Sequence, residues 1–222
     1  MIIFKSIKKL NNKVNFNDKI GFVPTMGALH EGHISLIKAS KRKCKKTIVS
    51  IFINKPQFNK KTDFRNYPRN ISKDTKILRK LNVDYLLMPN EKDIYSSNKK
   101  KKIKINKNDK IMCAKFRPGH FEGVLAVINQ FLLKIKPNLI LLGQKDFQQV
   151  YLIRKFISNK FKTKIIECKN LRNDNGLPYS SRNILLDKTN LIIASNVSNQ
   201  IKKFHKSVKL NFKNLKNFKL LD

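Results

Sequence analysis

The stretch Gly21-Phe22-Val23-Pro24-Thr25-Met26-Gly27-Ala28-Leu29-His30-Glu31-Gly32-His33 decides the fold of this 222-residue chain. Its apolar beginning predicts a buried strand, and a turn containing glycine leads from there into the first turn of a helix. This geometry aims backbone N–H groups and the positive helix end at an anion, while the small glycines let a ligand approach closely. The stretch therefore predicts a phosphate site.

Two imidazoles lie in this stretch. His30 and His33 are three residues apart, so both can face one ligand at a helix N-terminus. The alternative is a hinge turn in which one histidine is a cap and the other is exposed. Two histidines flanking a glycine favour a nucleotide site over this alternative. The spacing differs from HExxH, which disfavours zinc.

Around this stretch, short apolar runs alternate with segments of helical period, which predicts an α/β fold with a mainly parallel sheet. We expect strands at Lys19–Val23, Thr47–Ile53, Val83–Met88, Leu139–Leu142 and Ile165–Lys169. We expect helices at His33–Cys44, Ser72–Leu81 with Ser72 as its cap, Gly123–Lys134, Asp146–Phe156 with Asp146 as its cap, and from Asp187 or Thr189 to about Phe204. The Lys/Asn tract Ser96–Asn108 is expected to be an exposed hairpin or a mobile insertion.

The net charge of +35 would ordinarily suggest a nucleic-acid or lipid partner. It comes from 41 Lys and only 8 Arg, although arginine is the better bidentate phosphate ligand. We therefore interpret most of the charge as mutational drift in an AT-rich genome, and we expect no specific nucleic-acid partner.

The three cysteines, Cys44, Cys113 and Cys168, show neither CxxC nor Cys/His metal spacing, which indicates a reducing compartment. No segment approaches the ~18 apolar residues that a membrane span needs, and the N-terminus has lysines where a signal peptide needs apolar residues. We expect a cytoplasmic protein without a membrane partner.

Three further segments carry chemistry. Asn54 and Gln57 follow an apolar strand, although solvated amides at a strand exit are the simpler interpretation. Lys145 lies in Gly143–Gln149, a second strand-glycine-helix junction, where it could reach a phosphate or be one surface lysine among 41. The loop Leu171–Asn183 offers two hydroxyls and a guanidinium as a phosphate clamp, or an ordinary helix entry.

Five motifs occur in the order GFVPTMGALHEGH, VSIFINKPQF, RPGHFEGV, LLGQKDFQQ and NGLPYSSRN between residues 20 and 186. Together they resemble the pantothenate synthetases, or pantoate–β-alanine ligases, of the HxGH nucleotidylyltransferase superfamily. The resemblance implies a Rossmann-like ATP- and pantoate-binding domain over residues 1–183. It also implies a short remnant of a C-terminal lid domain over residues 184–222. The chain departs from the family at two places. It has Asn-Lys-Pro-Gln-Phe where the family usually has Asn-Pro-x-Gln-Phe, and Asn175-Gly176-Leu177-Pro178 where the family commonly has Asp-Gly-Leu-Ala.

The resemblance also implies the site residues. Catalytic roles fall to His33, the family's proton donor, and to His30, Lys145 and Arg182. ATP would be bound by Met26, Gly27, Ala28, Leu29, His30, Glu31, Gly32, His33, Gly143, Gln144, Lys145, Asp146, Leu171, Tyr179, Ser180, Ser181 and Arg182. Gln57 and Gln149 would bind pantoate or β-alanine. Apart from the resemblance, His120 at the start of a helix could be functional, but we expect it to be a packed supporting residue. Asp74 stands where the family has acidic residues near the metal, but no metal ligands are assigned. An imidazole that titrates near neutrality would suit the role of His33.

The implied reaction uses ATP and Mg²⁺. The carboxylate of pantoate attacks the α-phosphorus to give pantoyl adenylate and pyrophosphate, and β-alanine then gives pantothenate and AMP. A homodimer is implied too. With a shortened lid, we expect slower or leakier turnover, because an adenylate needs shielding from water.

The alternatives are a basic polyanion-binding protein on the same scaffold, a degenerate non-catalytic relic, and an adenylating enzyme with a different acid substrate. Intact His30, His33, Lys145 and Arg182 argue against a relic, and the paired Gln57 and Gln149 favour pantoate.

Overall fold

The computed structural model describes residues 1–95 and 103–214. The chain divides into two compact units, Met1–Asn170 and Leu171–Asp222. Residues 171–183, which the sequence analysis assigned to the catalytic domain, group here with the C-terminal helix. Each unit is described by itself.

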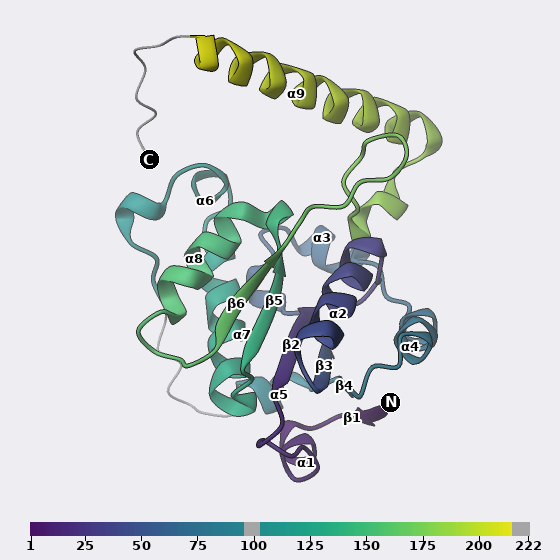
Figure 1. Cartoon of the computed structure of the whole chain (residues 1–222), viewed down its shortest axis with the longest axis vertical. Helices are drawn as coiled ribbons and strands as arrows, with labels where there is room; N and C mark the ends of the chain where they lie inside the picture. Colours follow the sequence, from purple (N-terminus) through teal and green to yellow (C-terminus); the bar gives the residue numbers. More distant parts are fainter. Residues whose placement is uncertain (96–102, 215–222) are drawn as a thin grey trace. The chain divides into compact units, whose positions relative to one another are not determined.

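The first unit is built on a six-stranded parallel sheet with the order β1-β4-β3-β2-β5-β6 (Figure 1). Its strands are β1 Ile2–Phe4, β2 Ile20–Thr25, β3 Lys46–Ile51, β4 Tyr85–Leu87, β5 Leu139–Gly143 and β6 Lys164–Cys168. From β2 the chain moves outward to β3 and β4 and then returns to β5 and β6 on the other side of β2, which is the Rossmann order. The predicted α/β class and the five predicted strands are confirmed. The edge strand β1 was missed because three residues leave no periodicity to detect.

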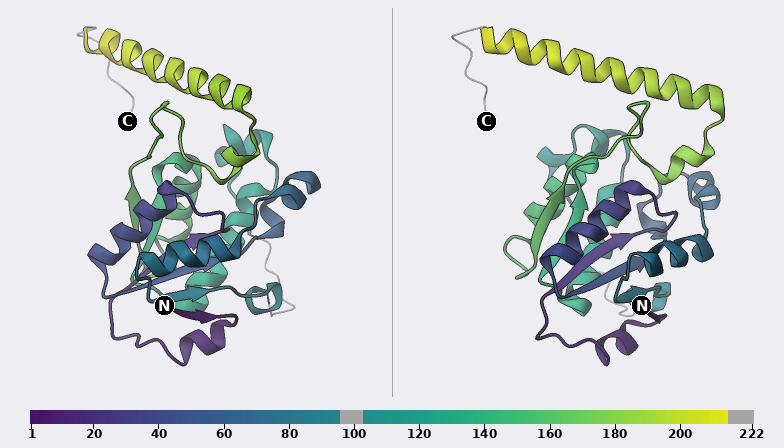
Figure 2. Two further views of the ribbon diagram at one scale, coloured as in Figure 1. Left: turned by 90° about the vertical axis from the view of Figure 1, so that its right-hand side faces the viewer. Right: turned by 45° about the vertical axis from the view of Figure 1, so that its right-hand side comes forward.

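Helices cover both faces of this sheet (Figures 1 and 2). They are α1 Ile7–Asn11, α2 Glu31–Lys43, α3 Lys61–Asn66, α4 Ile71–Lys80, α5 Glu91–Ile94, α6 Cys113–Phe116, α7 His120–Ile135 and α8 Phe147–Ile157, with 3-10 turns η1 Lys55–Gln57, η2 Lys107–Asp109 and η3 Gln144–Asp146. Four helices of this unit were predicted with nearly the right bounds. The cap of α4 is Asn70, which accepts the N–H of Lys73, rather than Ser72. Asp146 stands at the N-cap of α8 without a side-chain capping bond.

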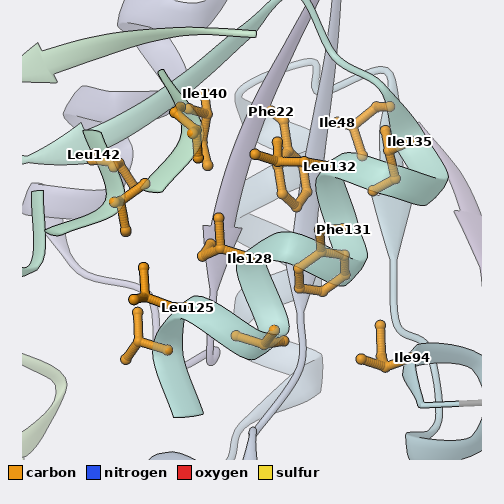
Figure 3. Close-up of a cluster of buried hydrophobic side chains, with 14 of the residues drawn as sticks. Phe22, Ile48, Ile94, Leu125, Ile128, Phe131, Leu132, Ile135, Ile140 and Leu142 are labelled. Atoms are coloured by element: carbon orange, nitrogen blue, oxygen red, sulfur yellow. The ribbon is translucent and has the colours of Figure 1, made fainter. Parts of the chain in front are cut away.

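Alternation along the strands produces two cores, because successive side chains of a strand point to opposite faces. Phe22 and Ile48 pack with α7, whose Phe131 and Leu132 are almost fully buried (Figure 3). The next residues, Val23 and Val49, face α2 and α4 and pack with Leu36, Ile37 and Leu78. Both faces of the sheet are therefore apolar, as a parallel sheet under two helix layers requires.

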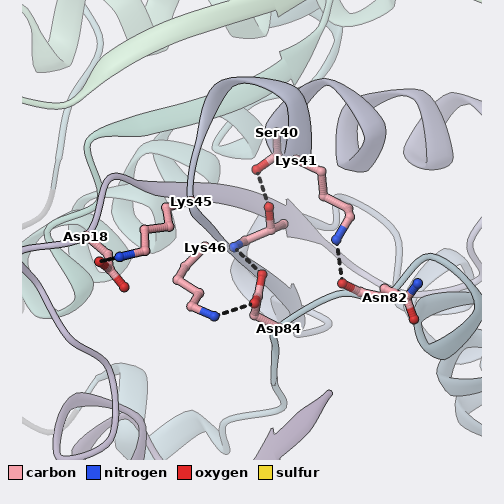
Figure 4. Close-up of polar contacts among 8 residues, drawn as sticks. Asp18, Ser40, Lys41, Lys45, Lys46, Asn82 and Asp84 are labelled. Carbon is pink, nitrogen blue, oxygen red and sulfur yellow. Dashed lines mark hydrogen bonds and ion pairs between the residues drawn. The ribbon is translucent and has the colours of Figure 1, made fainter.

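Polar contacts brace the amino ends of β3 and β4 (Figure 4). The carboxylate of Asp84 accepts the backbone N–H of Thr47 at 2.9 Å and the ammonium of Lys46 at 3.0 Å. The hydroxyls of Ser40 and Thr47 lie 2.8 Å apart and join α2 to β3. These contacts fix the end of the sheet that lies away from the carboxyl ends of the strands.

The segment after the Lys/Asn tract is anchored to α8. Residues 96–102 of the tract lie outside the described residues, so its expected hairpin or insertion is tested only from residue 103 onward. There Ile105 is buried. Asp109 pairs with Lys155 at 2.9 Å, and the amide of Gln148 donates to the carbonyl of Ile111. The expectation of an exposed segment is therefore wrong for Ile105, whose side chain packs inward, whereas Asp109 lies just beyond the tract.

The second unit contains the 3-10 turn η4 Ser181–Leu185 and the helix α9 Lys188–Asn214. Asp187 caps α9 by accepting the N–H of Asn190 at 2.7 Å. Of the two predicted caps, Asp187 and Thr189, the first is therefore confirmed. The helix continues ten residues beyond the predicted end at Phe204, since the Lys/Asn-rich sequence that follows contains no helix breaker. No helix in the described ranges is long and apolar enough to cross a lipid bilayer.

Candidate active site

The topology places two loops of the first unit next to each other. The strand order reverses between β2 and β5, and open α/β sheets bind ligands at the carboxyl ends of the strands at such a point. The loop after β2 carries His30, and the loop after β5 carries Lys145. The two strand-glycine-helix junctions predicted from sequence therefore lie at the same edge of the sheet, on neighbouring strands.

Backbone contacts fix the loop after β2. Gly27 has a φ of 79°, and its N–H donates to the hydroxyl of Thr25. The carboxylate of Asp74 on α4 accepts the backbone N–H groups of Ala28 and Leu29, each at 2.8 Å. Asp74 is only 2% exposed, and a Cβ at Gly27 would lie 3.0 Å from its Oδ2. Both carboxylate oxygens thus hold the loop, and the place near the metal that the resemblance suggested for Asp74 stays a prediction.

The two histidines stack at the start of α2. His30 is the N-cap residue, and its backbone N–H donates to Nδ1 of His33 at 3.4 Å. The ring centroids lie 4.0 Å apart, so the expectation that both imidazoles face the same region is confirmed. Glu31, between them, is exposed.

Burial and neighbouring charge keep both imidazoles neutral. Burial, together with the positive charge of Lys145, lowers the pKa of His30 to about 4. Burial, followed by His30 and Lys145, lowers the pKa of His33 to about 3. The expectation that His33 titrates near neutrality is therefore wrong for the free protein, because desolvation and a nearby cation both oppose protonation. As a neutral ring, each histidine offers one N–H donor and one acceptor.

Lys145 lies on η3, between the end of β5 and the start of α8. Its effect on both imidazoles shows that its charge is close to them, although the sequence alone could not separate it from 40 other lysines. Gly143 ends β5, while Gln144 and Asp146 are exposed beside Lys145. Gln149 is half-buried in the first turn of α8, on the same side of the sheet end.

Gln57 reaches the loop of the histidines from the carboxyl end of β3. Its amide Nε2 donates to Sδ of Met26 at 3.1 Å. The Asn-Lys-Pro-Gln sequence forms the single 3-10 turn η1, with Pro56 inside it and the N–H of Gln57 bonded to the carbonyl of Asn54. The altered proline position therefore still gives a compact turn.

His120 and Gly123 hold this turn from α7. Nδ1 of the buried His120 lies 2.7 Å from the carbonyl oxygen of Gln57, which confirms that His120 is a packed supporting residue. A Cβ at Gly123 would lie only 2.7 Å from the backbone carbon and oxygen of Pro56. The close approach of α7 to η1 requires glycine at this position.

The loop 171–183 of the second unit has its own framework. The guanidinium of Arg172 donates to the carbonyl of Gly176 and to the hydroxyl of Ser198 on α9. Ser180 caps η4 by accepting the N–H of Arg182, and Ser181 is buried. Leu171 is exposed, and the N–H of Tyr179 bonds to its carbonyl. The five candidate residues of this loop therefore belong to the second unit, whereas the other candidates belong to the first.

Sequence reasoning missed the role of one contributor to the first unit's site and missed another contributor entirely. It named Asp74 but not its role as the anchor of the loop, and it did not name Tyr95, whose hydroxyl donates to the buried Asn54. A separation of 41 residues and a position at the edge of the Lys/Asn tract gave no local signal for Tyr95. Within the described residues, no three His, Cys, Asp or Glu side chains gather as a metal site.

The comparisons with known proteins agree with this geometry. The family model of pantoate-beta-alanine ligase matches residues 2–220. The chain is 46% identical over 202 residues to the pantothenate synthetase of Francisella tularensis subsp. novicida, a match that covers 89% of this chain and 77% of the relative.

Two solved structures are also similar. One is the pantoate-beta-alanine ligase of Francisella tularensis complexed with beta-gamma ATP and beta-alanine, at 45% identity and a TM-score of 0.85, covering 90% of this chain and 78% of that one. The other is the pantothenate synthetase of Thermus thermophilus, at 29% identity and a TM-score of 0.84, covering 88% of this chain and 71% of that one. These matches favour the ligase over a polyanion-binding protein or a relic, and the chain belongs to the pantoate–β-alanine ligase family.

Proposed function

We propose that this chain condenses pantoate with β-alanine at the expense of ATP, through a pantoyl-adenylate intermediate. The observation that carries the proposal is the meeting of two strand-glycine-helix junctions at the point where the strand order reverses, with the charge of Lys145 acting on His30 and His33. A carboxylate and a triphosphate repel each other, so their reaction needs fixed positive charge and helix N-termini at one place.

The first step forms a bond between a carboxylate oxygen of pantoate and the α-phosphorus, and it breaks the bond to pyrophosphate. Negative charge grows on the leaving pyrophosphate, where the Lys145 ammonium and the N-terminus of α2 stabilise it. The neutral His30 and His33 act as N–H donors to phosphate oxygens. Gln57 and Gln149 hold pantoate. The second step breaks the bond between the acyl carbon and the phosphate oxygen, as the amine of β-alanine attacks that carbon and AMP leaves.

Mg²⁺ is expected to arrive with the nucleotide. Magnesium at nucleotide sites keeps several waters and needs only one or two protein carboxylates besides the phosphates, so the lack of a three-ligand cluster among the described residues fits this mode. Asp146, exposed beside Lys145, is the carboxylate that we propose for it. When bound, the ion would neutralise phosphate charge.

Other parts of the proposal rest on the family resemblance. They are ATP contacts by Leu171, Tyr179, Ser180, Ser181 and Arg182, the remaining ATP contacts of the two glycine junctions, a homodimeric state, and a cytoplasmic location. Light scattering coupled to gel filtration tests the dimer.

The test of function is product formation. The purified chain is incubated with ATP, Mg²⁺, pantoate and β-alanine, and pantothenate and AMP are quantified beside a His33→Ala variant. We expect equimolar pantothenate and AMP, and a loss of about 10²-fold or more in the variant. Absence of pantothenate from the folded wild-type chain, or an equally active variant, would overturn the proposal.

A further inference from the structure

A chain of hydrogen bonds runs behind Gln57. Asn54, at the carboxyl end of β3, is 1% exposed. Its amide Nδ2 lies 3.0 Å from the carbonyl oxygen of Gly123 on α7 and 3.1 Å from Oε1 of Gln57. Its Oδ1 lies 2.7 Å from the hydroxyl of Tyr95. Three segments of the chain thus meet at one buried amide.

The direction of every bond in this chain follows from one atom. The carbonyl oxygen of Gly123 can only accept, so the amide of Asn54 must turn its NH₂ group toward Gly123. The second hydrogen of this NH₂ group then points at Gln57, which must accept the hydrogen bond with its oxygen Oε1. The Oδ1 of Asn54 faces Tyr95, whose hydroxyl must donate. The NH₂ group of Gln57 is then turned toward Sδ of Met26, in the loop of the histidines.

We propose that Tyr95 is a positioning residue, which acts through Asn54 to make Gln57 a hydrogen-bond donor toward the acid substrate. A carboxylate carries acceptors only, so it binds the NH₂ end of an amide and is repelled by the oxygen end. The inference rests on the proposed function, since it assigns Gln57 to the acid. It adds Tyr95 as a second restraint, beside the carbonyl of Gly123, on the amide orientation that presents the NH₂ group of Gln57 to an acceptor-bearing ligand.

Two features suit Tyr95 to this position. Burial raises the pKa of its phenol to about 12, with the charge of Glu91 adding to the rise, so the hydroxyl keeps its proton throughout the physiological range. Asn54 also cannot use the Tyr95 hydroxyl in the opposite sense, because reversing its amide would set two oxygens against each other at Gly123. Without the hydroxyl, Oδ1 of Asn54 is left without this donor in a buried site, and the orientation of the amide loses one of its restraints.

The test is Tyr95→Phe, which removes one oxygen and keeps the ring. Tyr151→Phe is the matched control, because it too removes a donating hydroxyl from the first unit, the one that lies 3.5 Å from Oδ1 of Asp109. We expect the KM for pantoate to rise by roughly 3- to 10-fold in Tyr95→Phe, as for the loss of one buried hydrogen bond. The KM for ATP and the melting temperature should stay close to those of Tyr151→Phe.

A double-mutant cycle with Asn54→Ala separates positioning from general packing. If Tyr95 acts through Asn54, adding Tyr95→Phe to Asn54→Ala raises the KM for pantoate no further. An unchanged KM in the single variant, an equal rise in the KM for ATP, or additive effects in the double variant would overturn the inference. If the wild-type chain makes no pantothenate, the proposed function has failed. If it does and Tyr95→Phe behaves like wild type, only the inference has failed.

Discussion

The anchor of the histidine loop gives the sharpest prediction. Asp74→Asn keeps the size of the side chain but leaves one oxygen for two backbone N–H groups, those of Ala28 and Leu29. One of them must then face an NH₂ group. A hydrogen bond to a charged group is worth about 1.5–3 kcal/mol, and a buried N–H left unsatisfied adds a comparable cost. We therefore expect the free energy of unfolding to fall by roughly 2–4 kcal/mol, and the melting temperature by roughly 4–16 °C.

The same substitution should impair catalysis, because the loop that Asp74 holds leads directly into His30. A displacement of about 1 Å at such a site can cost on the order of 10²-fold in rate. The assay is AMP release in the full reaction, with kcat/KM for ATP measured next to thermal unfolding. We expect kcat/KM to fall by roughly 10- to 100-fold.

Asp84→Asn supplies the control. Asp84 also accepts a backbone N–H, that of Thr47, but at the amino end of β3 (Figure 4). We expect Asp84→Asn to lower the melting temperature while kcat/KM for ATP stays near wild type. Equal catalytic losses in the two variants, or no catalytic loss in Asp74→Asn, would refute the argument that Asp74 acts by holding the loop.

Three further predictions concern Lys145, the histidine pair and Gly123. Lys145→Gln should lower kcat by roughly 10²–10³-fold and raise the pKa of His30 and His33 in an NMR titration; unchanged histidine pKa values would contradict the proximity inferred here. The folded pKa values of His30 and His33, about 4 and 3, lie below the ordinary value of 6.5, so the unfolded chain binds more protons. The stability that the neutral histidines contribute above pH 6.5 should therefore be lost as the pH falls toward 3. In urea titrations at several pH values, the free energy of unfolding should depend less steeply on pH in His33→Asn than in wild type. Gly123→Ala, which in an open helix would stabilise by about 1 kcal/mol, should instead cost about 1–3 kcal/mol through the clash with Pro56, and a melting temperature at or above wild type would exclude it.

Local sequence patterns predicted the sheet and the two glycine junctions because each depends on residues that are close along the chain. The apolar runs of β2, β3 and β5 and the helix-period stretches of α2 and α7 carry their periodicity within a dozen residues. The pairing of His30 with His33 follows from helical spacing alone.

What the sequence could not predict depends on contacts across long separations. Asp74 meets Ala28 46 residues away, and Tyr95 meets Asn54 41 residues away. The lowered pKa of His33 needs the burial and charge that only the folded chain creates. From the sequence, a histidine is expected to have a pKa near neutrality, whereas the fold keeps this ring uncharged, as a hydrogen-bond donor. The end of α9 was misjudged because a Lys/Asn-rich sequence resembles a loop in composition while containing no residue that stops a helix.

The most direct test of the central claim follows the oxygen atoms of pantoate. The wild-type chain is supplied with pantoate labelled with ¹⁸O in the carboxylate, together with ATP, Mg²⁺ and β-alanine, and the AMP is analysed by mass spectrometry. An acyl-adenylate mechanism predicts AMP carrying one ¹⁸O, since the bridging oxygen leaves with the phosphate when the amine attacks the acyl carbon. AMP without the label, or ADP and phosphate in its place, would contradict the account.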